Sequence, residues 1–300
     1  MAASKAFNAT KAEKIFDICN FVIMAIIMIV TLYPFLNVLA ISLNDSTDTV
    51  RGGIYIWPRE FTLENYKTIF GYTGLIQGLK NTILRTVIGT VFGLISSSML
   101  AFTLSRQDFA SRKFVSTFLA LTMYFSGGLV PTYMLMRHLD LIGTFWIYIL
   151  PGIVSAFNVF VIRSFIDGLP YALQESAKLD GANDFKIYYK IILPLCKPVL
   201  ATIALFLAVG QWNSWFDNYL YNGNKPHLTT LQFELMKVLA STNQGAAMTN
   251  ANDMANQMAQ VSPESIKMAI TIVVTLPILF VYPFLQRYFV SGMTLGAVKA

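Results

Sequence analysis

Charged residues are scarce in this chain of 300 residues. Asp, Glu, Lys and Arg together make up 13% of it, whereas hydrophobic residues make up 55%. Typical soluble domains carry about 25% charged residues, and disordered chains combine high charge with low hydrophobicity. The composition therefore excludes a disordered chain and nearly excludes a soluble globule, whose surface so few charges could not cover. An integral membrane protein is the class that remains.

Cysteine and histidine are also rare. Cys19 and Cys196 are too few for a disulfide framework or a metal site. We expect Cys19 to be a buried small hydrophobe and assign no function to Cys196. The two histidines, His138 and His227, fall in different predicted loops. The chain contains no HExxH, G-x-S-x-G, HRD or glycine-rich phosphate-loop motif. We therefore expect no enzymatic activity, no metal and no cofactor in this chain.

The formal net charge is +6, but the 22 Lys and Arg residues are scattered between apolar runs. They form no basic stripe and no nucleic-acid-binding motif, so we expect no nucleic-acid partner. In a membrane protein, excess basic charge is typical of cytoplasmic loops that face anionic lipid.

About 20 apolar residues are needed to cross roughly 30 Å of hydrocarbon. The first candidate run is longer than the hydrophobic part of a signal peptide, which has about 7–15 residues. It therefore indicates an uncleaved helix, although Ala40-Ile41-Ser42 weakly resembles a cleavage site. The sequence predicts an all-α integral membrane protein with six transmembrane helices, at about 18–42, 81–104, 114–136, 145–162, 198–216 and 266–286.

Basic residues indicate the orientation of these helices, because they concentrate in cytoplasmic loops. With both termini inside, the inner segments hold 13 Lys or Arg residues, and the outer segments hold nine, including Arg85 and Lys267 at span ends. The sequence thus predicts that both termini are cytoplasmic. The inner segments are 1–17, 105–113, 163–197 and 287–300, and the outer ones are 43–80, 137–144 and 217–265.

Glycine and proline interrupt several of the runs. The interruptions are typical either of a packed bundle around a path or of ordinary kinks. Gly89 and Gly93 form a small-xxx-small pair, which favours a helix-packing face. No run has an acidic residue at its middle, and this disfavours a proton-driven carrier. The interrupting residues are Gly127, Gly128 and Pro131 in the third run, Pro151 and Gly152 in the fourth, and Pro277 and Pro283 in the sixth.

The predicted inner loop 163–197 is the most informative segment. Pro170 is suited to opening a short helix, residues 172–179 form an amphipathic stretch, and Gly181 is suited to ending it in a left-handed cap. A second amphipathic stretch runs from Phe185 to Ile192. From the residues alone, this helix–glycine–helix elbow is either a docking knob for another protein or an interfacial helix pair on lipid headgroups.

The same loop resembles the EAA motif of ABC-importer permeases, which has the form E-A-A-x3-G-x9-I-x-L-P. Every spacing matches, and Ser176 in place of the first alanine is the one departure. Outside the loop, residues 57–66 (WPREFTLENY) and the tail QRYFVSGMTLGAVKA resemble the carbohydrate branch of these permeases. The tail is most similar to permeases for complex oligosaccharides and polysaccharide fragments, including pectin and alginate types. The motif positions are occupied by Glu175, Ser176, Ala177, Gly181, Ile191, Leu193 and Pro194.

The resemblance implies a type I ABC-importer permease fold in a bacterial cytoplasmic membrane. It implies a second permease subunit, two cytoplasmic ATPase subunits that hold ATP and Mg, and an extracytoplasmic solute-binding protein. Residues 171–182 would be the coupling helix, in which Glu175 contacts a basic residue of an ATPase subunit. Ser176 and Ala177 would allow close approach, Gly181 would set the elbow, and Asp180, Ile191, Leu193 and Pro194 would complete the coupling site. The implied parts are 1–77, a permease core at 78–290 and a tail at 291–300.

Aromatic and amide side chains at the outer end of the fifth run suit a sugar path, because sugars stack on aromatic faces while their hydroxyls form hydrogen bonds. An interfacial aromatic belt is the alternative. By resemblance, the loop at 217–265 probes the binding protein. A secondary sugar carrier and a membrane enzyme remain less favoured functions. The candidate path residues are Gln211, Trp212, Asn213, Trp215 and Asp217, with Tyr124 and Asn158 as further candidates.

Overall fold

The computed structural model describes residues 11–243 and 262–297. Within these ranges the chain is helical, and the one β-type pairing is an isolated antiparallel bridge between Asn44 and Phe61. The predicted all-α class is therefore confirmed. The chain divides into two compact units, one built from the residues up to Gly71 together with Gly245–Val273, and one from Tyr72–Gln244 together with Val274–Ala300.

The first unit contains α1 (Lys11–Ser42), α2 (Ser46–Thr49), α3 (Glu64–Gly71) and the beginning of α15 (Pro263–Ala297). The apolar window of α1 has no buried residue within the chain, so its side chains face outward on all sides. Cys19 is among these exposed residues, and the expectation that it is buried is wrong. Only the end of α1 packs inward, where Ala40 and Ile41 contact Ile54.

A polar network shapes the segment that follows α1. The Asn44 side-chain carbonyl accepts hydrogen bonds from the backbone N–H groups of Arg59 and Glu60, at 2.8 and 2.9 Å. The Arg59 guanidinium lies 2.9 Å from the Asp48 carboxylate, and hydrogen bonds from Asn44 and Arg59 lower the pKa of Asp48. Asp45 caps α2 by accepting from the Thr47 and Asp48 N–H groups. The WPREF segment is thus fixed by side-chain bonds instead of by regular structure.

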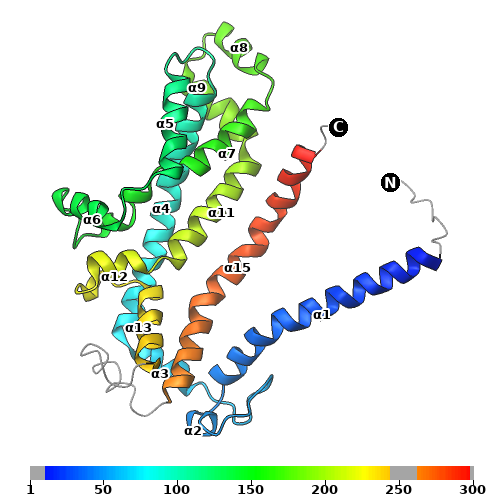
Figure 1. Cartoon of the computed structure of the whole chain (residues 1–300), viewed down its shortest axis with the longest axis vertical. Helices are drawn as coiled ribbons and strands as arrows, with labels where there is room; N and C mark the ends of the chain where they lie inside the picture. Colours follow the sequence, from blue (N-terminus) through cyan, green and yellow to red (C-terminus); the bar gives the residue numbers. More distant parts are fainter. Residues whose placement is uncertain (1–10, 244–261, 298–300) are drawn as a thin grey trace. The chain divides into compact units, whose positions relative to one another are not determined.

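In the second unit, α4 (Thr73–Ser105) packs against α7, α11 and α13 (Figure 1). Small residues on α4 allow close packing with α11, because a Cβ atom added at Gly89 or Gly93 would lie 2.8 Å from Gln211 or 3.2 Å from Leu207. The predicted packing face is confirmed. The other helices of the unit are α5 (Arg112–Tyr124), α6 (Leu129–His138), η1 (Phe145–Tyr148), η2 (Leu150–Gly152), α7 (Ala156–Asp167), α8 (Ala172–Leu179), α9 (Asp184–Ile187), η3 (Tyr188–Ile192), α10 (Leu193–Leu195), α11 (Lys197–Asn213), α12 (Phe216–Asn222), η4 (Pro226–Leu228), α13 (Leu231–Asn243) and the rest of α15.

Three of the predicted spans are single long helices and two are bent pairs, while the fifth corresponds to α11, which follows the helical segment Asp184–Leu195 at a sharp bend. The third run turns by 119° between α5 and α6, where Gly128 has a φ of +85°. The fourth bends by 48° before α7, and the segment leading into α11 bends by 84°. The glycine-rich break in the third run is therefore confirmed. The expected interruption of the sixth run is wrong, because α15 continues through Pro277 and Pro283.

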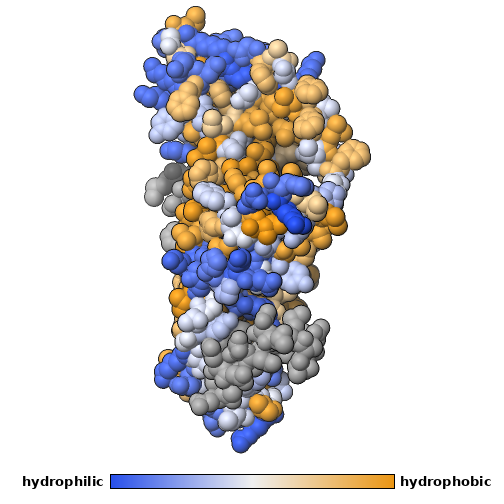
Figure 2. All heavy atoms as spheres, turned by 90° about the vertical axis from the view of Figure 1, so that its left-hand side faces the viewer, coloured by the Kyte–Doolittle hydropathy of each residue, from blue (hydrophilic) through white to orange (hydrophobic). Residues whose placement is uncertain are grey.

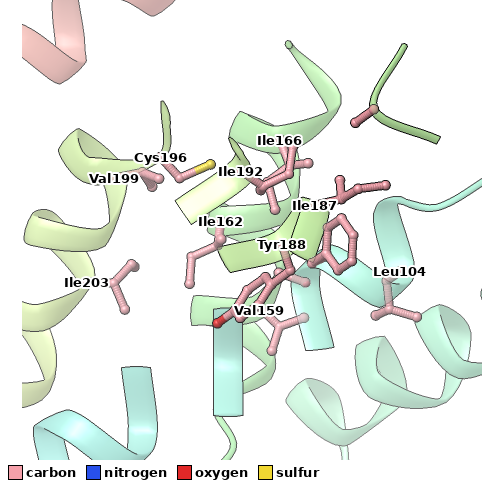
Figure 3. Packing of buried hydrophobic residues seen from close by; sticks show 13 residues of the cluster. Leu104, Val159, Ile162, Ile166, Ile187, Tyr188, Ile192, Cys196, Val199 and Ile203 are labelled. Carbon is pink, nitrogen blue, oxygen red and sulfur yellow. The ribbon is translucent and has the colours of Figure 1, made fainter. Parts of the chain in front are cut away.

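The main hydrophobic core of this unit joins α4, α7, the segment 177–192 and α11 (Figure 3). Ile187, Tyr188 and Ile192 from the second predicted amphipathic stretch are buried in it, with exposed fractions of 7% or less. Cys196 is buried in the same cluster. Figure 2 shows hydrophilic residues over the end of the molecule that carries α8 and α9, next to a band where hydrophobic residues gather.

Candidate functional site

The short helix α8 begins and ends as the sequence predicts. Its first turn is closed by the Leu173 N–H donating to the Pro170 carbonyl at 3.2 Å. At its end the Ala182 N–H donates to the Ala177 carbonyl at 2.9 Å, and the Gly181 N–H donates to the Lys178 carbonyl at 3.0 Å. These bonds form a Schellman motif, which requires a left-handed residue, and Gly181 has a φ of +75°. The predicted glycine cap is confirmed.

The residues of α8 at and beside the EAA-type positions divide between two faces. Gln174 and Ala177 are buried against the chain's own core, with exposed fractions of 4% and 7%. Glu175 and Ser176 are exposed. The outward face of α8 therefore presents a carboxylate beside a small hydroxyl side chain. Asp180 and Gly181 are exposed at the elbow, Ile191 and Leu193 pack against the core, and Pro194 is exposed.

A buried arginine lies behind α8. Arg106 caps the end of α4 with an exposed fraction of 4%. Its guanidinium binds Asp108 through two nitrogens at 2.6 and 3.0 Å, and one of these nitrogens lies 3.0 Å from Asp184 at the start of α9. It also donates to the Gln174 side chain at 3.4 Å. Lys178 binds the same Asp108 carboxylate at 2.6 Å, so this ionic cluster joins α4, α8 and α9.

The ionic cluster changes the acid–base behaviour of Asp108. Hydrogen bonds from Arg106 and then Lys178 lower the pKa of the Asp108 carboxyl far below its ordinary value of 3.8. The Arg106 pKa is raised, mainly through its hydrogen bond to Asp108. Both groups therefore keep their charges throughout the physiological pH range.

A second buried arginine lies towards the other end of α4. Arg85 has an exposed fraction of 1% and forms an ion pair with Asp217, with nitrogen–oxygen distances of 2.5 and 3.2 Å. It also donates to the Gln211 side chain at 3.1 Å and lies 4.5 Å from the centre of the Tyr148 ring. The structure thus brings together two predicted path residues, Gln211 and Asp217, around a cation that the sequence analysis did not select.

The other candidate path residues do not form one surface. Trp212 is 8% exposed and its ring N–H donates to the Val274 carbonyl at 3.0 Å. Trp215 packs against Phe216 and Tyr219, while Asn213 is exposed. Tyr124 is 84% exposed at the end of α5, and Asn158 is buried in the first turn of α7. Within the described residues, the predicted set is therefore divided between internal packing and scattered exposed positions.

Arg85 and Arg106 are the residues that sequence reasoning missed. Each lies at an end of a predicted hydrophobic run, a position where arginine usually extends to water. A usable signal for Arg85 is its position four residues before Gly89, which places both on one helix face. The part of the chain that the structure describes contains no group of three or more His, Cys, Asp or Glu residues able to hold a metal ion.

Comparisons with known proteins place this arrangement in a family. Residues 1–295 match the family described as "Binding-protein-dependent transport system inner membrane component". The chain is 36% identical to Protein LplC of Bacillus subtilis (strain 168), over all of both chains. It is 35% identical to the polygalacturonan/rhamnogalacturonan transport system permease protein YtcP of the same organism, over 96% of this chain and 99% of that one.

A solved structure agrees with the sequence comparisons. A chain in the crystal structure of a bacterial ABC transporter involved in the import of the acidic polysaccharide alginate superposes with a TM-score of 0.84 and 28% sequence identity. The match covers 95% of this chain and 100% of that chain. The resemblance drawn from the EAA-type motif is confirmed at the level of family and fold. The chain belongs to the binding-protein-dependent transport system inner membrane components.

Proposed function

We propose that the chain is the pore-forming permease subunit of an ATP-driven importer of oligosaccharides or polysaccharide fragments. The observation that carries the proposal is α8, a short capped helix that presents Glu175 and Ser176 outward at the spacing of the EAA motif. Such a helix suits a cleft on an ATPase subunit, and the family membership supports this reading. The chain supplies no phosphate-binding loop, so ATP and Mg belong on two partner ATPase subunits.

The proposed membrane arrangement has six spans with both termini in the cytoplasm. Among the described residues, three helices are long and apolar enough to cross a membrane, and each of the three bent pairs would contribute one further span. This arrangement places α8 and the Arg106 cluster on the cytoplasmic side, at the surface of a bacterial inner membrane. A second permease subunit would complete the pore, and an extracytoplasmic binding protein would deliver the sugar.

The substrate class that we propose follows the relatives. One relative is a polygalacturonan/rhamnogalacturonan transport system permease protein, another is an arabinooligosaccharides transport system permease protein, and the matching structure is that of a transporter involved in the import of alginate. The sharpest experiment measures ATP-dependent uptake by proteoliposomes that contain the whole complex and its binding protein. Labelled digests of polygalacturonan, alginate and arabinan are the probes. No uptake of any digest would overturn the proposed substrate class.

The docking role of α8 has its own test. We expect Glu175→Arg to abolish uptake and to reduce co-purification of the ATPase subunits, because the outward carboxylate is replaced by a cation. Glu60→Arg is the matched control, since Glu60 is also an exposed acidic residue but lies in the first unit. Normal uptake by the Glu175 variant would contradict the proposed function.

We further propose that Asn213 and Trp215 contribute to the sugar path, supported by the exposed Asn213 amide and the aromatic group around Trp215. Gln211 and Trp212 are bonded within the chain, so alanine at either position also disturbs packing. The single change Asn213→Ala is therefore the cleaner test. An unchanged KM and maximal rate of uptake would remove Asn213 from the path.

A further inference from the structure

The ionic cluster behind α8 is more than a local salt bridge, because Arg106 belongs to a different helix. Its backbone N–H donates to the Thr103 carbonyl and so continues the end of α4. Its side chain reaches Gln174 on α8 and Asp184 on α9, and Asp108 extends the cluster to Lys178. Gln174 and Lys178 are four positions apart, so they lie on one face of α8. The helix is thus held at two successive turns.

Little else holds α8 in place. Gln174 and Ala177 are its only buried residues, and Ala177 is the one that contributes to the hydrophobic core. Next to them, a cavity of about 250 Å³ is bordered by Ser105, Tyr171 and Gln174, among other residues. Apolar packing beneath α8 is therefore incomplete. The polar bonds to Arg106 and Asp108 supply most of the specific attachment.

The other packing partners of α4 connect the attachment at Arg106 to the rest of the second unit. Along its length α4 packs closely against α11 and α7. The α4 residues next to Arg106, namely Ala101, Phe102 and Leu104, belong to the same core as those helices. We propose that Arg106 is a positioning residue that locks α8 and α9 to the end of α4, so that a displacement of α8 moves α4 as one body. The inference rests on the proposed function of α8 as the coupling helix.

Arginine is suited to this task in a way that lysine is not. The planar guanidinium offers five N–H donors in a fixed fork, whereas lysine offers a point charge on a flexible stem. The bidentate bond to Asp108 fixes the plane of the guanidinium, and the remaining donors then face Gln174 and Asp184. A lysine at this position would keep the charge but lose the simultaneous bonds to Asp108, α8 and α9.

The first test measures the attachment itself. In the full complex, hydrogen–deuterium exchange of residues 172–184 is compared between the wild type, Arg106→Gln and Arg106→Lys. We expect exchange to be about tenfold faster in Arg106→Gln, within the usual range of coupling between sites, and intermediate in Arg106→Lys. Arg163→Gln is the matched control, because Arg163 borders the same cavity but binds Ser116 and Asp167. Unchanged exchange in Arg106→Gln would overturn the inference, and this result does not depend on any transported sugar.

The second test measures coupling as the amount of sugar taken up per ATP hydrolysed. The probe is whichever labelled digest the wild type takes up: polygalacturonan, alginate or arabinan. We expect Arg106→Gln to keep its ATPase subunits and their ATP hydrolysis while uptake per ATP falls about tenfold. Lys178→Met removes only the half-exposed ion pair between Lys178 and Asp108. It should lower the ratio of uptake to ATP hydrolysis about twofold, as for an exposed ion pair.

The outcomes separate the two proposals. Loss of ATPase co-purification in Arg106→Gln, or a fall in ATP hydrolysis that matches the fall in uptake, would show a merely structural role and overturn the inference. An unchanged ratio in Arg106→Gln would also overturn it. Normal coupling in Glu175→Arg would instead count against the proposed function of α8, whatever the Arg106 variants do.

Discussion

The buried pair of Arg85 and Asp217 leads to an asymmetric stability prediction. The Arg85 side chain is 2% exposed, whereas the Asp217 side chain is 22% exposed. Removing one partner of a buried pair costs about 3–5 kcal/mol, because the other charge is left uncompensated. The two single changes leave different charges behind, so their costs in free energy of unfolding should lie at different ends of this range.

Asp217→Leu leaves a guanidinium that water cannot reach, and Gln211, the Ser214 carbonyl and the Tyr148 ring compensate it only in part. We expect the free energy of unfolding to fall by about 5 kcal/mol. Arg85→Met leaves a carboxylate that is partly exposed and still accepts the Asn218 N–H at 2.8 Å. Arg85→Met should therefore lower the free energy of unfolding by about 3 kcal/mol. The double change removes both charges and should cost less than either single change.

The assay is unfolding of the purified chain in mild detergent by titration with sodium dodecyl sulfate, followed by circular dichroism. A double-mutant cycle then gives the interaction energy of the pair. Equal losses for the two single changes would refute the argument from exposure. Losses that simply add in the double variant would refute the pairing itself.

Three further predictions concern other positions. Gly78→Ala should destabilise the chain by about 1–3 kcal/mol, because its Cβ would lie 3.0–3.2 Å from the backbone of residues 230 and 231. Gly210→Ala in α11, with no atom within 4 Å, is the control and should not lower the apparent melting temperature. Gly181→Ala should raise the free energy of the folded elbow by about 1–2 kcal/mol and lower uptake per ATP, whereas Gly181→Asn, which tolerates positive φ better, should do so less. Equal effects of the two would contradict the capping argument. The depressed pKa of Asp108, caused first by Arg106, places its stabilising contribution at full strength above the ordinary carboxyl pKa of 3.8. That contribution is lost only as the pH falls from there towards the lower folded-state pKa. Hydrogen–deuterium exchange in α8, corrected for the intrinsic pH dependence of amide exchange, should therefore not change between pH 5 and pH 8. A step in the exchange rate in this range would contradict the assignment.

Short-range patterns predicted much of this structure. The apolar runs located the long helices, because hydrophobic length alone defines them. Gly181 predicted the left-handed cap, since few other residues adopt that conformation. Gly89 and Gly93 predicted the packing face of α4 because their four-residue spacing places them on one side of a helix. Each of these features depends on residues a few positions apart.

Features that depend on distant contacts escaped the sequence. Arg85 and Asp217 are 132 positions apart, and no local pattern links them. The exposure of Cys19 was also missed, because hydropathy does not distinguish a side chain that packs on protein from one that faces outward on an apolar helix. The 119° turn between α5 and α6 could be located from Gly127 and Gly128, but its angle depends on the packing of both helices.

The separation of Arg85 from Asp217 also has a consequence for biosynthesis. At about 5–20 residues per second, the ribosome needs roughly 7–26 s to add the 132 residues between them. Throughout that time the nascent α4 carries an arginine whose acidic partner does not yet exist. Arg85 lies near an end of the predicted run 81–104, where an unpaired arginine can extend to water, so its cost is smaller than the about 2.5–3.5 kcal/mol of an arginine at the centre of a membrane helix. The ion pair between Arg85 and Asp217 can therefore form only after α12 has been synthesised.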